Sequence, residues 1–356
     1  MTADLRPLLD AAGARWGERF GVPVPLRFGG RPQPEVAALR TGCGVVVPPL
    51  RGLLRLVGED RTSFLQGMIS NDIAACAPGR GCHAAVLTVQ GRVVSDLHAY
   101  VQEDEIWLDV PVQRTATVRE TLEKYIVADD VEIETPEGLA LLMLEGPTAP
   151  ATLASVVDVD VVSLPPYGHV GCSIGDVDAR LFRANLTGEW GCMIVGPPEL
   201  QRVAWETACA AGGVPVGYDA VEVARIEAGI PMMDVDMDES YLAPEVGLAD
   251  ALSFRQGCSI RQEVVERVAA RGNVQRKLVG LVLEGDETVP PGALVRSDER
   301  DLGHVTSAAF SEELNAPIAL AYVRRSHADA GARVVVDAGA GPRTATVRSL
   351  SRDPES

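Results

Sequence analysis

Long apolar runs, lysine and aromatic residues are all scarce in this sequence of 356 residues. No stretch approaches the roughly 20 apolar residues that a membrane-spanning helix needs. The first residues include Asp4 and Asp10 and lack the apolar core of a secretory signal. The formal net charge of -18 argues against binding to nucleic acid or to an anionic membrane through overall charge. These absences predict a cytoplasmic protein with neither of those partners.

The cysteines are scattered along the chain, and the histidines form no pair at the spacing of metal ligands on a helix. An odd number of cysteines without a C-x-x-C spacing is typical of a reducing compartment, where thiols stay unpaired. We therefore expect no disulfide framework and no intrinsic metal centre. The seven cysteines are Cys43, Cys76, Cys82, Cys172, Cys192, Cys209 and Cys258.

Periodic apolar patterns predict a mixed α+β chain with antiparallel sheets. A strand is expected over 53–57, and helices are expected over 113–126 and 198–212. From residue 277 onward, short strands alternate with turns rich in Gly, Pro and Asp, which is typical of a small β-barrel or sandwich. The predicted division is an N-terminal leader over 1–48, a two-lobed domain over 49–276 and a β domain over 277–356.

One stretch reverses the acidic character of the chain, because residues 253–277 carry many arginines and only two acidic side chains. This stretch places Cys258 after Gly257, in a loop that leads into an amphipathic helix. A thiol among guanidinium groups is shifted toward the thiolate, its reactive form. The alternative is a solvated arginine-rich helix beside an ordinary cysteine.

Five segments form a series along the chain: LVGEDRTSFLQGMISNDI with APGRGCHAAVLTVQGRVVSDL, LTGEWG at 186–191, ARIEAGIPMMDVDMDE at 224–239, LSFRQGCSIRQE at 252–263 and LGHVTSAAFSEELNAPIALAYV at 302–323. Together they resemble the folate-binding aminomethyltransferase superfamily. This superfamily includes the T-protein of the glycine cleavage system and a YgfZ-type paralogue linked to iron–sulfur proteins. The resemblance implies a T-protein-like three-lobed α+β fold, with two α+β folate-binding lobes and a C-terminal β-barrel. It also implies tetrahydrofolate as the cofactor.

Glu189 lies in the segment that resembles the T-G-E-x-G turn of the T-protein, whose glutamate holds the pterin ring. A carboxylate suits this role because it accepts two parallel hydrogen bonds, from the 2-amino group and the ring N–H. Gly188 and Gly191 suit a tight turn that brings the backbone close to a flat ligand. The alternative is an ordinary hairpin turn with an exposed acid.

Arg225 matches an arginine of the T-protein that contacts folate. It lies on an apolar helix beside Val221 and Ile226, where a guanidinium needs a planar acidic partner from the ligand or from the protein. The alternative is a salt bridge to Glu222 or Glu227 on the same or an adjacent turn.

Asp96 matches the catalytic acid of the T-protein, which manages the proton near the folate nitrogen during aminomethyl transfer. The T-protein carries two consecutive acids at this point, whereas this chain has Ser95 before Asp96. YgfZ-type members also keep a single acid, so the departure favours them. The alternative is a strand-end aspartate that caps a turn.

Cys258 lies where the YgfZ type has its K-G-C-Y-x-G-Q-E signature. The Gly–Cys pair and the trailing Gln–Glu are kept, whereas Gln256, Ser259 and Arg261 replace the lysine, the tyrosine and the second glycine. We hypothesise a thiol of lowered pKa, available for redox chemistry or for a transient one-carbon or sulfur adduct.

The preferred interpretation is a YgfZ-like tetrahydrofolate-binding protein that supports the assembly or repair of iron–sulfur cluster proteins. Asp96 and Cys258 would be its catalytic residues, and Glu189 and Arg225 would bind the cofactor. The expected partners are folate and iron–sulfur proteins or their assembly factors. One alternative is a folate-dependent aminomethyltransferase or methyltransferase of the T-protein type. Another is a folate-binding scaffold without chemistry, in which Cys258 is structural.

Overall fold

The computed structural model describes residues 5–253, 274–297, 300–337, 339 and 341–350. The chain divides into two compact units, and each is described by itself. Unit 1 comprises Met1–Val86 and Ser95–Val221, and unit 2 comprises Leu87–Val94 and Glu222–Ser356.

The first sheet of unit 1 has six strands in the order β10-β11-β12-β9-β3-β13. Neighbouring strands are antiparallel, except that β13 runs parallel to β3. Its apolar face packs on α6, with Leu144 and Ile194 in one core cluster with Leu200 and Ala204. The strands are β3 (Gly44–Val46), β9 (Ala140–Glu145), β10 (His169–Ile174), β11 (Val177–Phe182), β12 (Gly191–Gly196) and β13 (Val214–Val216).

A second sheet, of five strands in the order β5-β6-β7-β4-β8, carries the Asp96 segment. The predicted strand at 53–57 lies within β4, and the strand that contains Asp96 is β6. Because side chains alternate between the two faces of a strand, one face of each strand can pack in the core while the other carries polar groups. The strands are β4 (Arg51–Val57), β5 (Arg80–Leu87), β6 (Val93–Val101), β7 (Ile106–Pro111) and β8 (Glu132–Glu134).

The helices are short, and two of them match predicted ones. The pattern over 113–126 gives α4 (Thr115–Glu123), and the pattern over 198–212 gives α6 (Pro198–Ala210). No helix in the described part of the chain is both long enough and apolar enough to cross a membrane. The remaining elements outside the barrel are the hairpin β1 (Ala14–Arg19) and β2 (Val22–Phe28) and the helices α1 (Arg6–Ala11), α2 (Gln33–Thr41), α3 (Arg61–Gln66), α5 (Ala149–Leu153) and α7 (Tyr218–Ala228).

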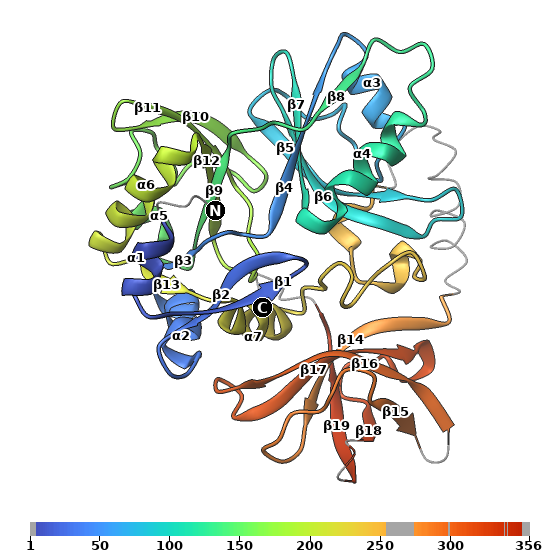
Figure 1. Cartoon of the computed structure of the whole chain (residues 1–356). Coiled ribbons are helices and arrows are strands. Elements are labelled where there is room, and N and C mark those ends of the chain that lie inside the picture. The colour runs from blue at the N-terminus through green and yellow to red at the C-terminus, as the bar shows by residue number, and fades with distance from the viewer. Residues whose placement is uncertain (1–4, 254–273, 298–299, 338, 340, 351–356) are drawn as a thin grey trace. The chain divides into compact units, whose positions relative to one another are not determined.

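In unit 2, six strands close into a barrel in the order β14-β17-β16-β15-β18-β19, drawn in orange to red in Figure 1. Alternate residues of β14, namely Val279, Leu281 and Leu283, point into its core, as the period of a strand requires. The predicted α+β class and the C-terminal β-barrel are thereby confirmed. The strands are β14 (Arg276–Leu283), β15 (Leu294–Ser297), β16 (Arg300–Ser311), β17 (Ala316–Arg324), β18 (Arg333–Asp337) and β19 (Pro342–Arg348).

Candidate functional site

Four strands of the five-stranded sheet bring charged and titratable side chains together around Asp96. Asp96 and His98 are two residues apart on β6 and therefore lie on one face of that strand. The neighbouring strands add His83 from β5, Asp109 from β7 and Arg51 from β4. We call these five residues the Asp96 cluster.

Asp109 pairs with two members of this cluster, Arg51 and His98. Its Oδ1 lies 2.6 Å from Arg51 Nε, and its Oδ2 lies 2.9 Å from His98 Nδ1. His98 and Asp109 are direct partners across β6 and β7, so the sheet register creates this contact. Burial lowers the pKa of His98, which favours the neutral ring at pH 7. Burial alone would raise the pKa of Asp109, yet that pKa is lowered because Arg51 and His98 stabilise the carboxylate.

Asp96 forms the other half of the cluster and is less completely paired. Its Oδ2 lies 3.9 Å from His83 Nε2, while its Oδ1 is buried and has no hydrogen-bond partner within the described residues. Burial alone would raise the pKa of Asp96, but His83 and the charged Arg51 lower it. The side chain retains 16% of its exposure. The cluster therefore contains an ionised carboxylate with one buried oxygen whose hydrogen-bonding capacity is unfilled among the described residues.

Ser95, which replaces the second acid of the T-protein, lies on the opposite face of β6 from Asp96 because consecutive strand residues alternate. It is fully buried, and its hydroxyl donates to the backbone carbonyl of Asp96 at 2.8 Å. An acid at this position would not share a face with Asp96. The replacement of the second acid by Ser95 therefore does not change the side chains on the Asp96 face of β6.

The turn that carries Glu189 is held by an arginine and a glycine. Arg40, from α2, donates from Nη1 to Glu189 Oε1 at 2.8 Å and to the Thr187 carbonyl at 3.2 Å. Gly188 has φ +83°, a conformation that favours glycine, and its N–H donates to Asn185 Oδ1 at 2.9 Å. Two elements distant in sequence thus fix the Glu189 carboxylate at the surface of unit 1.

A second carboxyl group, that of Glu145 at the end of β9, is hydrogen-bonded to the same turn. It is fully buried and accepts hydrogen bonds from the Leu186 N–H and the Thr187 hydroxyl. Burial raises the pKa of Glu145 to about 7, although these hydrogen bonds and Arg40 act in the opposite direction. A buried group that titrates near neutrality therefore holds the predicted pterin-binding turn.

An aromatic residue, Trp190, follows Glu189 directly in the chain. Trp190 is half-buried, and the guanidinium carbon of Arg183 lies 4.2 Å from its ring centroid. A carboxylate that accepts hydrogen bonds, with an aromatic residue next to it in the sequence, fits a flat heterocycle with an amino group and a ring N–H. The residues present at this turn thus fit the pterin end of a folate.

Arg225 lies in unit 2 and is almost completely buried, with 1% of its surface exposed. Its Nε and Nη2 donate to Glu222, and its Nη1 donates to Asp236 Oδ2 at 2.7 Å. Nη1 also donates to the Ile230 carbonyl, and Nη2 also donates to the Ser307 hydroxyl. The sequence left two partners open for Arg225, a ligand or a neighbouring glutamate, and the ion pair with Glu222 is the second of these. Every nitrogen of this guanidinium is engaged by a protein group.

Asp236 is the centre of this network, and the sequence motifs did not single it out. It is fully buried and accepts hydrogen bonds from the Met232 N–H and from the Thr306 and Ser307 hydroxyls, in addition to Arg225. The Thr–Ser pair belongs to the LGHVTS segment on β16. The register of β16 shifts between Val305 and Ser307, so two consecutive hydroxyls can both reach Asp236. Two hydroxyls on an otherwise apolar strand were the sequence signal for a buried polar partner.

The four predicted site residues therefore do not form one described cluster. Asp96 and Glu189 belong to unit 1, where each has its own set of partners, and Arg225 belongs to unit 2. Cys258 lies within 254–273, outside the described residues, so its role as a reactive thiol remains a prediction. Among the described residues, no group of three or more His, Cys, Asp or Glu side chains could hold a metal ion.

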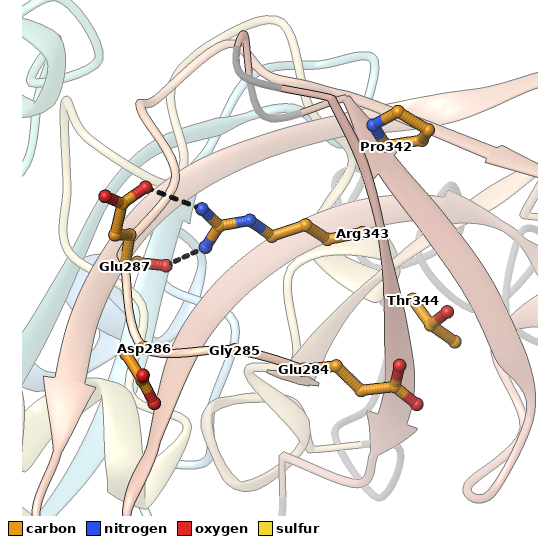
Figure 2. Close-up of a pocket in the computed structure, with 7 residues that line it drawn as sticks. All are labelled: Glu284, Gly285, Asp286, Glu287, Pro342, Arg343 and Thr344. Atoms are coloured by element: carbon orange, nitrogen blue, oxygen red, sulfur yellow. Dashed lines mark hydrogen bonds and ion pairs between the residues drawn. The ribbon is translucent and has the colours of Figure 1, made fainter.

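An open pocket of ≈ 580 Å³ lies on the barrel, as Figure 2 shows. Its one basic side chain, Arg343, is held by Glu287, with Nη2 2.8 Å from Oε2 (Figure 2). The remaining charged groups of the lining are acidic, so they repel an anionic ligand such as a folate. This pocket includes none of the predicted site residues. Its lining residues are Glu284, Gly285, Asp286, Glu287, Pro342, Arg343 and Thr344.

Comparison with known proteins supports the aminomethyltransferase side of the superfamily. Residues 5–256 match the GCVT N-terminal domain, and residues 276–351 match the glycine cleavage T-protein C-terminal barrel domain. An aminomethyltransferase of Synechococcus elongatus is 29% identical over 344 residues, covering 95% of this chain and 92% of the relative. One of Streptomyces coelicolor is 30% identical over 341 residues, covering 92% and 91%.

A solved structure shares the fold. The glycine cleavage system aminomethyltransferase T from Bartonella henselae has a TM-score of 0.89 at 22% identity, covering 98% of this chain and 97% of that one. The predicted T-protein-like fold is therefore confirmed.

The prediction of a YgfZ-like protein that serves iron–sulfur proteins was wrong. The relatives from Synechococcus elongatus and Streptomyces coelicolor are aminomethyltransferases, and nothing in the comparisons is specific to the YgfZ type. That prediction depended on the segment around Cys258, where Gln256, Ser259 and Arg261 replace three residues of the YgfZ signature. It also depended on the presence of only one acid, Asp96, where the T-protein has two. Because Ser95 lies on the opposite face of β6, its presence is no argument for the YgfZ type.

The two domain matches together cover nearly the whole chain, in the order found in the T-protein. Proteins of this family bind tetrahydrofolate, so the predicted cofactor is confirmed as that of the family. The chain belongs to the folate-binding aminomethyltransferase superfamily and has both domains of the glycine cleavage T-protein.

Proposed function

We propose that this chain is a tetrahydrofolate-dependent aminomethyltransferase of the glycine cleavage T-protein type. Its relatives from Synechococcus elongatus and Streptomyces coelicolor carry that activity in their names. The observation that carries the proposal is the Asp96 carboxylate, which is ionised, largely buried and has one oxygen without a partner among the described residues. A carboxylate that accepts a proton must be ionised beforehand, and an oxygen without a protein partner leaves its proton-accepting position unfilled.

Each proposed site residue has one task. Tetrahydrofolate, when bound, supplies the nitrogen that accepts the one-carbon unit. Glu189 binds the pterin end through its carboxylate, and Asp96 takes up or returns the proton at its Oδ1. His83 and Arg51 keep Asp96 ionised between turnovers. Arg225 contributes by positioning, since it fixes the partly exposed Glu222 and the turn over 230–236.

Two further expectations are part of the proposal. The division into a leader over 1–48, a folate-binding domain over 49–276 and a barrel domain over 277–356 remains a proposal, with β1, β2, α2 and β3 of the first segment contributing to unit 1. A cytoplasmic location is supported by the unpaired state of every cysteine that the structure describes.

The binding part is tested by calorimetric titration of tetrahydrofolate into the purified protein and into Glu189→Gln. The charge-assisted hydrogen bonds of Glu189 contribute about 1.5–3 kcal/mol each, so Kd should rise about 10- to 100-fold. Glu206→Gln is the matched control, because Glu206 is an exposed glutamate in an i,i+4 pair on α6. Equal affinity of Glu189→Gln and the parent protein would remove Glu189 from the site.

The chemical part is tested by turnover, with the aminomethyl carrier of a glycine cleavage system as donor and tetrahydrofolate as acceptor. Asp96→Asn keeps the shape of the side chain and removes the base, so kcat should fall about 10²- to 10⁴-fold while tetrahydrofolate still binds. A parent protein that binds tetrahydrofolate tightly but forms no methylene-tetrahydrofolate would overturn the enzyme proposal and favour a folate-binding scaffold.

A further inference from the structure

Asp96 and Arg51 lie in one row across the five-stranded sheet. Arg51 of β4 is the register partner of Pro111 of β7. On the other side of β7, Asp109 is the register partner of His98 of β6. The same register, continued by two residues along β6 and β7, brings Asp96 level with Pro111. The row across these three neighbouring strands is therefore Asp96, Pro111 and Arg51.

The two charged side chains of this row stand on the same face of the sheet. Asp109 is the partner of Leu53 as well as of His98, and residues directly opposite each other share a face. Arg51 is two residues from Leu53, and Asp96 is two residues from His98, so both share that face. Neighbouring strands lie about 4.8 Å apart, so the Cα atoms of Asp96 and Arg51 are about 10 Å apart. The residue between them is a proline, whose ring carries no polar group.

Arg51 has donor capacity that the protein does not use. Its Nε donates to Asp109 Oδ1 at 2.6 Å, and its Nη2 donates to the Asp109 carbonyl at 2.9 Å. Its Nη1 has no hydrogen-bond partner among the described residues, and it is not completely buried. The side chain as a whole keeps 10% of its exposure. One nitrogen of a largely buried guanidinium is thus left for an acceptor from outside the protein.

Asp96 carries the opposite charge at the other end of the row. Its side chain keeps 16% of its exposure, and its Oδ2 lies 3.9 Å from His83 Nε2, which is longer than a hydrogen bond. Its Oδ1 is buried and accepts no hydrogen bond within the described residues. The Asp96 carboxylate therefore lacks a cationic hydrogen-bond partner in the part of the chain that the structure describes.

We propose that this row binds a small zwitterionic α-amino acid of about the size of glycine. Its ammonium group binds the Asp96 carboxylate, and its carboxylate binds Arg51 Nη1. The amino nitrogen and the carboxyl carbon of an α-amino acid are about 2.5 Å apart, and a charge-assisted hydrogen bond of about 2.8 Å at each end extends the span to about 8 Å. This span suits two side chains that rise from Cα atoms about 10 Å apart. Asp96 and Asp109 together outnumber Arg51 in charge, so a neutral zwitterion suits the row better than an anion.

The amino acid would occupy the place beside Asp96 where the proposed function requires the aminomethyl group. Free glycine should therefore compete with the aminomethyl carrier during turnover, and this consequence rests on the proposed function. Binding itself does not rest on it, because binding needs neither tetrahydrofolate nor the carrier.

Three probes separate the two ends of the ligand: glycine, methylammonium, which lacks the carboxylate, and acetate, which lacks the amine. Each is titrated into the full-length protein at pH 7 without folate, and binding is followed by ligand-observed NMR. We expect glycine to bind at least about tenfold more tightly than methylammonium, because it gains one charge-assisted hydrogen bond, and acetate to bind most weakly. Equal affinities for glycine and methylammonium, or no detectable binding of glycine, would overturn the proposal.

Variants locate the site. Asp96→Asn should weaken the binding of both glycine and methylammonium, whereas Arg51→Gln should weaken only glycine, to the level of methylammonium. Arg51→Gln leaves the buried Asp109 carboxylate without its cation, so the double variant Arg51→Gln, Asp109→Asn removes both charges and should bind in the same way. Arg55→Gln is the matched control, because Arg55 lies on the same face of β4, is 38% exposed and pairs with Glu134. It should leave all three affinities unchanged.

The outcomes also separate this proposal from the proposed function. Glycine binding that is unchanged in Asp96→Asn and in the double variant would place the site elsewhere and overturn the proposal. A parent protein that binds glycine but forms no methylene-tetrahydrofolate would refute the proposed function and support this inference. A parent protein that forms methylene-tetrahydrofolate but does not bind glycine would do the reverse.

Discussion

Asp236 in unit 2 and Asp96 in unit 1 are both carboxylates held near an arginine, yet their surroundings differ. Asp236 is fully buried and accepts hydrogen bonds from Arg225, from two hydroxyls and from a backbone N–H. Asp96 has His83 at 3.9 Å and Arg51 as a nearby charge, and its Oδ1 has no partner among the described residues.

The difference separates structural charge from functional charge. A buried charge whose hydrogen-bonding capacity is filled stabilises one conformation and has little left for a ligand. A buried carboxylate with one oxygen that accepts no hydrogen bond loses its hydration without full compensation. A ligand can supply the missing hydrogen bond. On this basis Asp236 and Arg225 hold unit 2 together, while Asp96 is the carboxylate that the proposed function uses.

The largest effect on stability is expected when the hydrogen-bond network of Arg225 and Asp236 is broken. Arg225→Leu leaves the Asp236 carboxylate buried without its positive partner, so the free energy of unfolding should fall by about 3–5 kcal/mol. Denaturant unfolding measures this, and Arg202→Leu on the surface of α6 is the control, with an expected change below about 1 kcal/mol. If Arg225→Leu were as stable as the parent but lost tetrahydrofolate affinity, Arg225 would be a ligand-binding residue and the contrast between the two networks would fail.

A smaller effect, which depends on pH, is expected at Glu145. Its pKa rises from 4.5 to about 7 on folding, so its contribution to stability is fully present below pH 4.5 and is lost as the pH rises through about 7. This loss amounts to about 3 kcal/mol. Glu145→Gln should flatten this part of the stability curve, measured by denaturant unfolding between pH 4 and pH 8. An amide can still accept from the Leu186 N–H and donate to the Thr187 hydroxyl.

Glu206→Gln provides the control for the Glu145 variant, because that exposed side chain should leave the slope unchanged. Burial also raises the pKa of Glu35, so a residual slope of the same sign should remain in both variants. A slope in Glu145→Gln equal to that of the parent would assign the titration to another group.

The smallest effect is expected at His83. Because His83 helps to lower the pKa of Asp96, His83→Phe should raise that pKa, and the acid limb of the turnover profile should move toward neutral pH. The stability that ionised Asp96 contributes is present above its unfolded pKa and is lost as the pH falls through its folded pKa, so this loss should begin at higher pH in the variant.

Carbon-13 NMR of the Asp96 carboxyl group measures the same shift independently of activity. His327→Phe, on the barrel, should leave the Asp96 titration unchanged. An unchanged titration in His83→Phe would assign the lowered pKa to Arg51 and His98.

The sequence predicted the parts of the fold that have strong periodicity. The apolar spacing around α4 and α6 and the regular short strands of the barrel indicated elements that the structure contains. Residues 14–46 are rich in glycine and proline and gave no strand signal, yet they form two paired strands, a helix and β3. Strands of this kind depend on partners that are remote in sequence, which local patterns do not reveal.

The candidate site was predictable only where motifs carried it. Asp96, Glu189 and Arg225 each lie in a segment that resembles the family. His83 lies in the same segment as Asp96 but does not stand out there, and Arg51 and Asp109 lie outside the five segments. Register brings those three next to Asp96 from separate strands, as the pairing of His98 with Asp109 shows. The hydrogen bonds that engage every nitrogen of Arg225 could not be predicted without knowing which residues lie across from it. The opposite face of Ser95, in contrast, follows from the alternation of side chains along a strand.

The parallel pairing of β3 with β13 has a consequence for synthesis of the chain on the ribosome. Gly44–Val46 pairs with Val214–Val216, about 170 residues later, and β9 provides its other neighbour. At a translation rate of about 5–20 residues per second, β3 emerges on the order of ten to thirty seconds before its last partner. During that interval a short apolar strand has an open edge, which is a template for aggregation. Nascent chains that stall before residue 214 should therefore depend on chaperones far more than chains that extend past residue 216.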